Sequence, residues 1–412
     1  MPLIRPLAGL RPQPEYAADV IAPPYDVLNT EEARLRAEGR PWSFLHISKP
    51  EIDLPPNTDP YSDAVYAKGR ENLHKMLNAG ILKPDAQPHY YLYRLTMGNH
   101  QQTGLVAVAN VTDYDNNRIR KHELTRPDKE DDRVRQIDAL NAQTGPVFLT
   151  YKHHPSMDDL IKTLTTSSPI VNITADDGIV HTLWIVDNPA HIDTITTTFD
   201  NMDCLYIADG HHRSAAASRV AALRRGNNSQ HTGEEAYNYF LTVIFPDNQM
   251  QILDYNRVAR DLNGLSTSAF LERLTQNFDV ESRSQATKPQ KNGEFGMYLE
   301  GQWYQLTLHA DKIPTHDPVA RLDVSLLTEY LLNPLLGITD PRRDKRIDFV
   351  GGIRGLTELE KRVNSREMAV AFALYPTEMS ALMAVADAQQ IMPPKSTWFE
   401  PKLADGLVSH LL

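Results

Sequence analysis

Five consecutive residues, Asp209-Gly210-His211-His212-Arg213, combine a carboxylate, a flexible glycine, two imidazoles and a guanidinium. A guanidinium can bind phosphate through two parallel hydrogen bonds, and a glycine lets the backbone approach a ligand closely. Gly210, His211, His212 and Arg213 are therefore candidate phosphate-binding residues. Because a carboxylate repels phosphate, Asp209 has three other roles open to it: capping a helix, holding a metal ion, or accepting a proton.

A strand and a helix must position these five residues. The apolar run at 205–208 predicts a buried strand, and Asp-Gly is a turn dipeptide. The segment 212–225 is rich in Ala, Leu and Arg, which predicts a helix. The first turn of a helix has free N–H groups and a partial positive charge, so it attracts anions. The plainer alternative is a capped surface helix with incidental histidines.

A second cluster, Lys121-His122-Glu123, offers a cation, an imidazole and a carboxylate. It precedes a charged segment, 127–141, that we predict to be a helix with Thr125 as its N-cap. This set of groups suits the activation of a hydroxyl next to a phosphate: Lys121 would add a positive charge and Glu123 would accept the proton. A solvated charged face is the alternative.

Other polar side chains along the N-terminal half are candidates for binding a small substrate. Asp26 follows a rigid Pro-Pro pair, and His46 lies near the end of a predicted strand at 42–47. Arg94 lies on the first arm of a hairpin predicted over 89–111, and Arg133 on the charged helix. A structural role is the alternative for each. The full candidate set is Asp26, His46, Arg94, His122 and Arg133.

Strand and helix patterns alternate over residues 140–225, which favours a mixed α/β architecture. Beyond residue 261 the pattern changes to a helical segment, a polar linker and a hairpin. This change predicts two regions, an α/β core at 1–262 and an α+β C-terminal region at 263–412. We expect the tail of the second region to pack back on the core. Lys395, Ser396 and Thr397 in that tail could donate to an anion, or the tail could be purely structural.

Composition narrows the class of protein. Of 412 residues 41% are hydrophobic and 23% charged, which is typical of a folded globular chain. The net charge of −11 without a basic tract disfavours broad nucleic-acid binding. The single cysteine, Cys204, excludes an intrachain disulfide framework and a multi-cysteine zinc site.

Several familiar signals are missing. No apolar run approaches membrane-spanning length and no signal peptide is visible, so we expect a cytoplasmic protein. The sequence lacks a Walker loop, a Rossmann glycine fingerprint, an HExxH zinc motif and a GxSxG nucleophile elbow. A nucleotide would therefore need a different phosphate-binding element.

Four motifs, at residues 22–27, 121–125, 209–213 and 392–397, resemble those of one bacterial and archaeal family. They read Ala-Pro-Pro-Tyr-Asp-Val, Lys-His-Glu-Leu-Thr, Asp-Gly-His-His-Arg and Met-Pro-Pro-Lys-Ser-Thr. The family is catalogued as a domain of unknown function, number ten-fifteen. The matches occur in order over nearly the whole chain.

The Asp-Gly-His-His-Arg element is also similar to the phosphate loop of the ParB/sulfiredoxin-like superfamily, which includes free L-serine kinases. This resemblance implies a nucleotide-binding core of that fold, with residues 210–213 holding the phosphates of ATP or ADP and Mg²⁺ bridging them. It implies a carboxylate base beside the acceptor hydroxyl, with Glu123 the first choice and Asp209 the second. Asp209 is also the expected metal ligand. The family pattern has an aromatic residue after the motif, where this chain has Ser214.

Three functional hypotheses follow. The first is a nucleotide-dependent kinase that phosphorylates a small hydroxyl compound, with an amino acid such as free L-serine as the expected substrate. The second is a ParB-like nucleotide-binding regulator without catalysis. The third is a metal-dependent hydrolase using His211, His212 and Asp209. The sequence leaves the oligomeric state open, a homo-oligomer included.

Overall fold

The computed structural model describes residues 2–412 and divides into two units. The first unit comprises Met1–Met250 together with Pro401–Leu412, and the second comprises Gln251–Glu400. The second unit starts earlier than the boundary expected at residue 262, because the strand β14 (Tyr255–Ala259) belongs to its sheet. The last residues of the chain belong to the first unit, so the second unit interrupts the first in sequence.

The first unit contains a nine-stranded sheet with the order β6-β11-β8-β12-β5-β4-β10-β9, and β1 pairs with β5. Strand β11 runs parallel to β6 and antiparallel to β8, and β8 runs parallel to β12. The predicted mixed α/β class is thus confirmed. The strands are β1 (Ile4–Arg5), β4 (Tyr90–Met97), β5 (His100–Asn110), β6 (Ile119–Arg120), β8 (Val147–Tyr151), β9 (Val171–Thr174), β10 (Val180–Val186), β11 (Leu205–Asp209) and β12 (Tyr239–Pro246).

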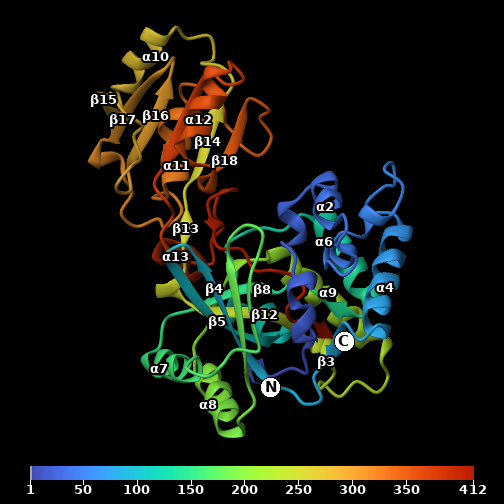
Figure 1. The fold of residues 1–412 in the computed structure, drawn as a ribbon. Helices are drawn as coiled ribbons and strands as arrows, with labels where there is room; N and C mark the ends of the chain where they lie inside the picture. The colour runs from blue at the N-terminus through green and yellow to red at the C-terminus, as the bar shows by residue number, and fades with distance from the viewer. Residues whose placement is uncertain (1) are drawn as a thin grey trace. The chain divides into compact units, whose positions relative to one another are not determined.

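Helices cover this sheet, and α4, α6 and α9 pack in succession beside one another (Figure 1). The main core joins the strands to apolar residues of α7, α8 and α9, among them the fully buried Phe199 and Ala221. Burial of each large apolar side chain contributes about 1.5–3 kcal/mol. The helices are α1 (Ala17–Val20), α2 (Thr30–Ala37), α3 (Leu45–Ser48), α4 (Asp63–Asn78), α5 (Val111–Asp115), α6 (Pro127–Leu140), α7 (Pro155–Leu164), α8 (Pro189–Asp200) and α9 (His211–Asn227).

Two small sheets tie the ends of the chain into the first unit. Strand β2 (Leu10–Pro12) pairs with β3 (Leu82–Pro84), and β7 (Ala142–Gln143) pairs with β21 (His410–Leu411). Isolated bridges join Leu10 to Ser409 and Ala22 to Asp405. The final residues are therefore held by backbone pairing to segments near the start and middle of the unit.

The second unit is built on a six-stranded antiparallel sheet with the order β15-β17-β16-β19-β14-β18, and α12 packs on it through Leu359 and Val363 (Figure 1). A two-stranded sheet pairs β13 (Ile252–Leu253) with β20 (Trp398–Phe399). The other elements are β15 (Phe278–Arg283), β16 (Glu294–Leu299), β17 (Gln302–Leu308), β18 (Ile347–Gly351), β19 (Val370–Leu374), α10 (Thr267–Leu274), α11 (Asp323–Leu327), α12 (Gly355–Asn364) and α13 (Met379–Asp387).

Two local predictions were wrong. The segment 42–47, predicted as a strand, ends in helix α3, because the N–H groups of Ile47 and Ser48 both donate to the Phe44 carbonyl. Helix α6 has Arg126 rather than Thr125 at its N-cap, since the Thr125 hydroxyl donates to Glu130 instead of to the helix end. Pro127 occupies the first helical position, where its missing N–H leaves no hydrogen bond unmade.

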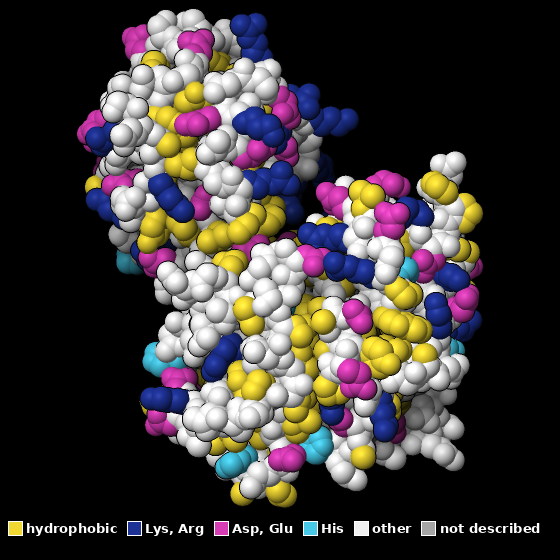
Figure 2. Space-filling model, viewed as in Figure 1, with side chains coloured by type: hydrophobic (Ala, Val, Ile, Leu, Met, Phe, Trp, Pro, Cys, Tyr) yellow, Lys and Arg dark blue, Asp and Glu magenta, His cyan; other side chains and the backbone are white. Residues whose placement is uncertain are grey.

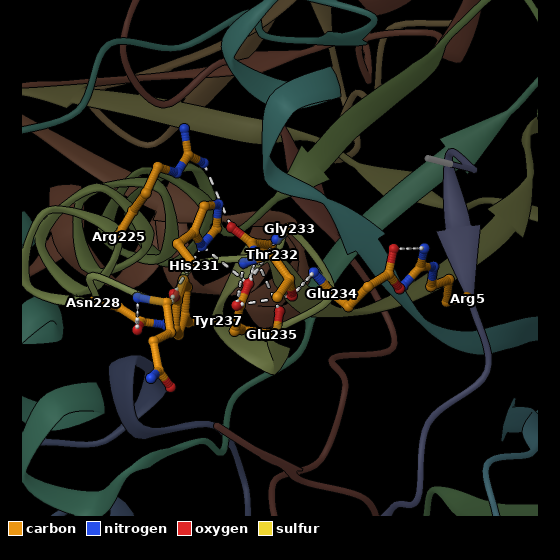
Figure 3. A network of polar contacts seen from close by, with 11 residues as sticks. Arg5, Arg225, Asn228, His231, Thr232, Gly233, Glu234, Glu235 and Tyr237 are labelled. Atoms are coloured by element: carbon orange, nitrogen blue, oxygen red, sulfur yellow. Dashed lines mark hydrogen bonds and ion pairs between the residues drawn. The ribbon is translucent and has the colours of Figure 1, made fainter.

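The loop after α9 is fixed by a polar network centred on Glu235 (Figure 3). Its carboxylate accepts hydrogen bonds from the N–H groups of Thr232 and Gly233 and from the Thr232 hydroxyl, and lies 3.0 Å from His231 Nδ1. Desolvation alone would raise the pKa of Glu235, but these donors together outweigh it and lower the pKa to about 2. These contacts fix the loop at residues 231–235.

On the face shown in Figure 2, basic and acidic side chains of the first unit are interspersed rather than segregated. Among residues 2–412, no helix combines the length and apolar character that crossing a membrane requires.

Candidate functional site

The candidate site begins where β11 ends. Gly210 links Asp209 to helix α9 with φ +95°, a backbone conformation that favours glycine. A Cβ atom at this position would lie 3.1 Å from Arg213 Nε and 3.4 Å from the Cα of Val147. The glycine thus allows the Arg213 side chain to fold back over the turn.

The N-terminus of α9 has no side-chain cap. Asp209, one of the candidate caps, instead accepts a hydrogen bond from the N–H of Gly210 at 2.8 Å through Oδ1. The amide groups of the first helical turn therefore keep their capacity to donate, and the helix end keeps its partial positive charge. An anion placed there would gain both interactions.

Arg213 supplies a full positive charge beside this helix end. Within the described chain, its only hydrogen bond is donated by Nη1 to the Pro146 carbonyl oxygen. Its Nη2 atom lies 3.8 Å from a carboxylate oxygen of Asp26 and 3.8 Å from one of Asp209, and both distances are longer than hydrogen bonds. Although burial opposes ionisation, these carboxylates raise the pKa of Arg213, so the guanidinium stays charged with donors to spare.

Asp209 lies between two cations. Its Oδ2 is 3.4 Å from Lys402 Nζ and 3.8 Å from Arg213 Nη2. Burial alone would raise the pKa of Asp209, but the positive charges of Lys402 and Arg213 outweigh it and hold the pKa well below its usual range. Its side chain remains about one-third exposed (35%), so an ionised oxygen is accessible from solvent.

The histidines contribute polarity rather than charge. Burial lowers the pKa of His122 to about 4, and it lowers the pKa values of His211 and His212 as well. The N–H of Arg126 donates to His212 Nε2 at 3.1 Å, and the N–H of His122 approaches His211 Nε2 at 3.4 Å. Both Nε2 atoms therefore act as acceptors, which places the proton of each ring on Nδ1.

Glu123 lies beside the protonated nitrogen of His211. The distance from Glu123 Oε2 to His211 Nδ1 is 3.7 Å, and half of the Glu123 side chain (49%) is exposed. The His122 and His211 rings meet edge to face with centroids 4.5 Å apart. The structure thus brings the two motifs 121–125 and 209–213 together, with an accessible carboxylate next to the start of α9.

His122, Glu123 and His211 also form a group in which one possible ligand atom from each lies within 4.8 Å of the others. A metal ion there would require His211 Nδ1 to release its proton. His122 Nδ1 is buried and has no hydrogen-bond partner in the described chain, so its lone pair is available. The residues weighed for a hydrolase differ: His212 and Asp209 are not part of this group.

The remaining sequence candidates fall into two sets. Asp26 pairs with Arg213, and Arg133 stacks over the neighbouring Tyr25 ring at 3.9 Å. By contrast, Lys121 stacks on Tyr114, His46 binds Asp53 and the Arg40 carbonyl oxygen, and Arg94 binds Thr103 and stacks on Trp184. These partners direct the last three side chains to groups other than residues 209–213.

Sequence reasoning missed two residues near the loop, Lys402 and Asp405. Both come from the final segment, and Asp405 lines a cavity that Arg213 also lines. The expected tail donors Lys395, Ser396 and Thr397 belong to the second unit instead, where Ser396 Oγ donates to the Pro393 carbonyl oxygen. Lys402 and Asp405 follow the motif at 392–397 but belong to no motif themselves, so no sequence signal marked them as site residues.

Fold and site together define a mixed α/β protein in which strand β11, next to the edge strand β6, ends at an uncapped helix start flanked by Arg213 and Lys402. The chain belongs to the family described as "Protein of unknown function (DUF1015)", whose model matches residues 4–325. A comparison with curated proteins finds no match.

Three solved structures resemble the chain distantly. A conserved hypothetical protein from Pyrococcus furiosus is 13% identical, with 74% of this chain and 95% of that chain covered and a TM-score of 0.35. A free serine kinase in complex with AMP is 11% identical, with 71% and 86% covered and a TM-score of 0.35. C-terminally truncated SbnI from Staphylococcus aureus is 12% identical, with 74% and 87% covered and a TM-score of 0.39. At these scores, function must be argued from the site itself.

Proposed function

We propose that the protein transfers a phosphoryl group from ATP or ADP to the hydroxyl of a small molecule, with free L-serine as the expected acceptor. The observation that carries this proposal is the uncapped start of α9 beside Arg213. Glu123, from the segment before α6, lies there too, with Oε2 3.7 Å from Nδ1 of His211 in the first turn of α9. Phosphoryl transfer depends chiefly on positioning and charge stabilisation, and these residues can provide both.

Each group has a distinct role in this proposal. The free N–H groups at the start of α9 and the unused donors of Arg213 bind phosphate oxygens. Lys402 holds Asp209 ionised, and the accessible Asp209 oxygen fits a Mg²⁺ ion bound to those phosphates. When bound, Mg²⁺ would neutralise charge on the phosphates.

Glu123 is the proposed base. Its carboxylate accepts the proton of the acceptor hydroxyl as that oxygen forms a bond to the terminal phosphorus. The bond from that phosphorus to the nucleotide breaks, and the nucleotide leaves with one phosphate fewer. His211 Nδ1–H, 3.7 Å away, steadies the carboxylate without taking part in the transfer.

Purified full-length protein incubated with Mg²⁺, L-serine and either ATP or ADP tests the proposal. We expect O-phosphoserine to form with one of the two nucleotides. If neither nucleotide supports product while both raise the melting temperature, free serine is not the acceptor, and the alternative of a nucleotide-binding regulator is favoured. If neither binds, the anion-binding role of α9 is wrong.

A further inference from the structure

A small, partly open cavity in the first unit lies next to the Asp209–Arg213 turn, whose Arg213 side chain lines it. It has a volume of about 30 Å³ and is lined by Tyr25, Ser48, Arg133, Arg213 and Asp405, among others. One water molecule needs about 10–15 Å³ by the same measure. The cavity therefore has room for an ammonium group and an attached methylene, but not for a nucleobase.

Two buried acceptor atoms in this cavity lack partners. Asp405 Oδ1 and Ser48 Oγ have no hydrogen-bond partner within residues 2–412, and their residues are only 2% and 5% exposed. A buried polar atom without a partner destabilises the fold, because it has lost its hydrogen bonds to water and gained none in return. Such atoms are usually satisfied by a bound water or by a ligand.

Asp405 has no ion-pair partner within 4.0 Å in the described chain, although Arg213 and Arg133 act on it from farther away. Arg133 forms an ion pair with Asp132 at 2.6 Å. Arg213 lies 3.8 Å from a carboxylate oxygen of Asp26 and 3.8 Å from one of Asp209. Burial raises the pKa of Asp405 to about 7, while Arg213 and Arg133 lower it and Asp26 raises it further. A buried carboxyl that needs a cation and a hydrogen-bond donor is matched by an ammonium group.

We propose that this cavity is an ammonium-binding subsite, in which Asp405 Oδ1 and Ser48 Oγ accept hydrogen bonds from the primary ammonium group of a small ligand. Under the proposed function, on which this assignment of the ligand rests, that ligand is the phosphate acceptor. Arg213 lines both the cavity and the start of α9, so an acceptor anchored here would have its hydroxyl close to the bound phosphates. The subsite then selects amino alcohols and hydroxy amino acids over polyols and sugars.

The test uses the full chain with ADP present and compares three probes by calorimetry. L-Serine carries ammonium, carboxylate and hydroxyl; ethanolamine lacks the carboxylate; glycerate has a hydroxyl in place of the ammonium. We expect serine and ethanolamine to bind and glycerate to fail. Equal binding of glycerate and serine overturns the proposal, and so does the absence of binding by both amines, because the cavity then holds only water.

Asp405→Asn provides the matching variant. Its amide oxygen still accepts from the Tyr25 N–H, but its NH₂ group can turn toward the ammonium, so serine should bind roughly 10- to 100-fold more weakly. Ser48→Ala should weaken serine less. Asp113→Asn, which alters a partly exposed carboxyl (17%) paired with Arg118 at 3.6 Å, is the control and should leave serine binding unchanged.

The two proposals fail separately. The shift in melting temperature caused by ADP without any amine reports the phosphate site and shows that Asp405→Asn is folded. If that shift is normal and Asp405→Asn binds serine like the wild type, the ammonium subsite is wrong and the phosphate site stands. If amines bind through Asp405 but no nucleotide binds, the proposed kinase function fails and the subsite stands.

Discussion

Gly210→Ala changes the backbone of the turn between Asp209 and α9 most directly. The alanine would have to adopt φ +95°, a backbone conformation that is unfavourable for a non-glycine residue by about 1–3 kcal/mol. Its Cβ would also lie 3.1 Å from Arg213 Nε and 3.2 Å from Cζ, so the guanidinium must move by a few tenths of an ångström. We therefore expect the free energy of unfolding to fall by about 1–3 kcal/mol.

Nucleotide affinity should fall in the same variant, because the strained turn and the displaced guanidinium no longer match the phosphate geometry that the wild-type turn provides. Each 1.4 kcal/mol of lost interaction is about tenfold in affinity, so we expect ADP to bind at least about tenfold more weakly. Urea unfolding measures the stability change, and calorimetry with ADP measures the affinity.

Gly226→Ala is the matched control, because it lies on the same helix with an ordinary φ and open space within 4 Å of the position that its new methyl group would take. Alanine is a better helix former than glycine by about 0.5–1 kcal/mol, so this variant should be neutral or slightly more stable. If Gly210→Ala behaves like Gly226→Ala in both assays, the strained turn is not an anion site and the reasoning fails.

Three further outcomes are expected. Glu123→Gln should lower the phosphorylation rate by about 10²–10⁴-fold while ADP binding persists, which single-turnover assays and calorimetry would show; an unchanged rate excludes Glu123 as the base. Lys402→Met removes the main charge that depresses the pKa of Asp209. Since that stabilisation is present above the unfolded pKa near 3.8 and is lost at lower pH, the urea midpoint should fall less between pH 5 and 2 than in the wild type. For Asp405, whose pKa is raised to about 7, the unfolded chain ionises first, so wild-type stability should decline from pH 4 to 7. A parallel decline in Asp405→Asn would contradict this assignment.

The parts of the site that are local in sequence were predictable. The strand, turn and helix at 205–227 follow from an apolar run, a turn dipeptide and a helix-forming composition, and β11 and α9 occur there. Motif chemistry predicted that Glu123 would act beside phosphates held by residues 210–213, but not its approach to His211. No local pattern could have supplied it, because the parallel pairing of β6 with β11 creates it.

The protonation states and the distant partners were not predictable from residue types. His211 and His212 look like cations in the sequence, but burial keeps them neutral and turns them into hydrogen-bonding groups. His46 looked like a strand-end candidate and instead binds Asp53 from helix α3. Lys402 approaches Asp209 across 193 residues of sequence, and no periodicity reports such a contact.

The return of residues 401–412 to the first unit has a consequence for biosynthesis. A ribosome makes residues 1–250 first, then all of the second unit, and only afterwards Lys402 and Asp405, which belong to the proposed phosphate and ammonium subsites. A nascent or prematurely terminated chain can therefore fold much of the large sheet yet carry an Asp209 without its lysine. The side chains of Lys402 and Asp405 are therefore added to the first unit only after the whole of the second unit has been made.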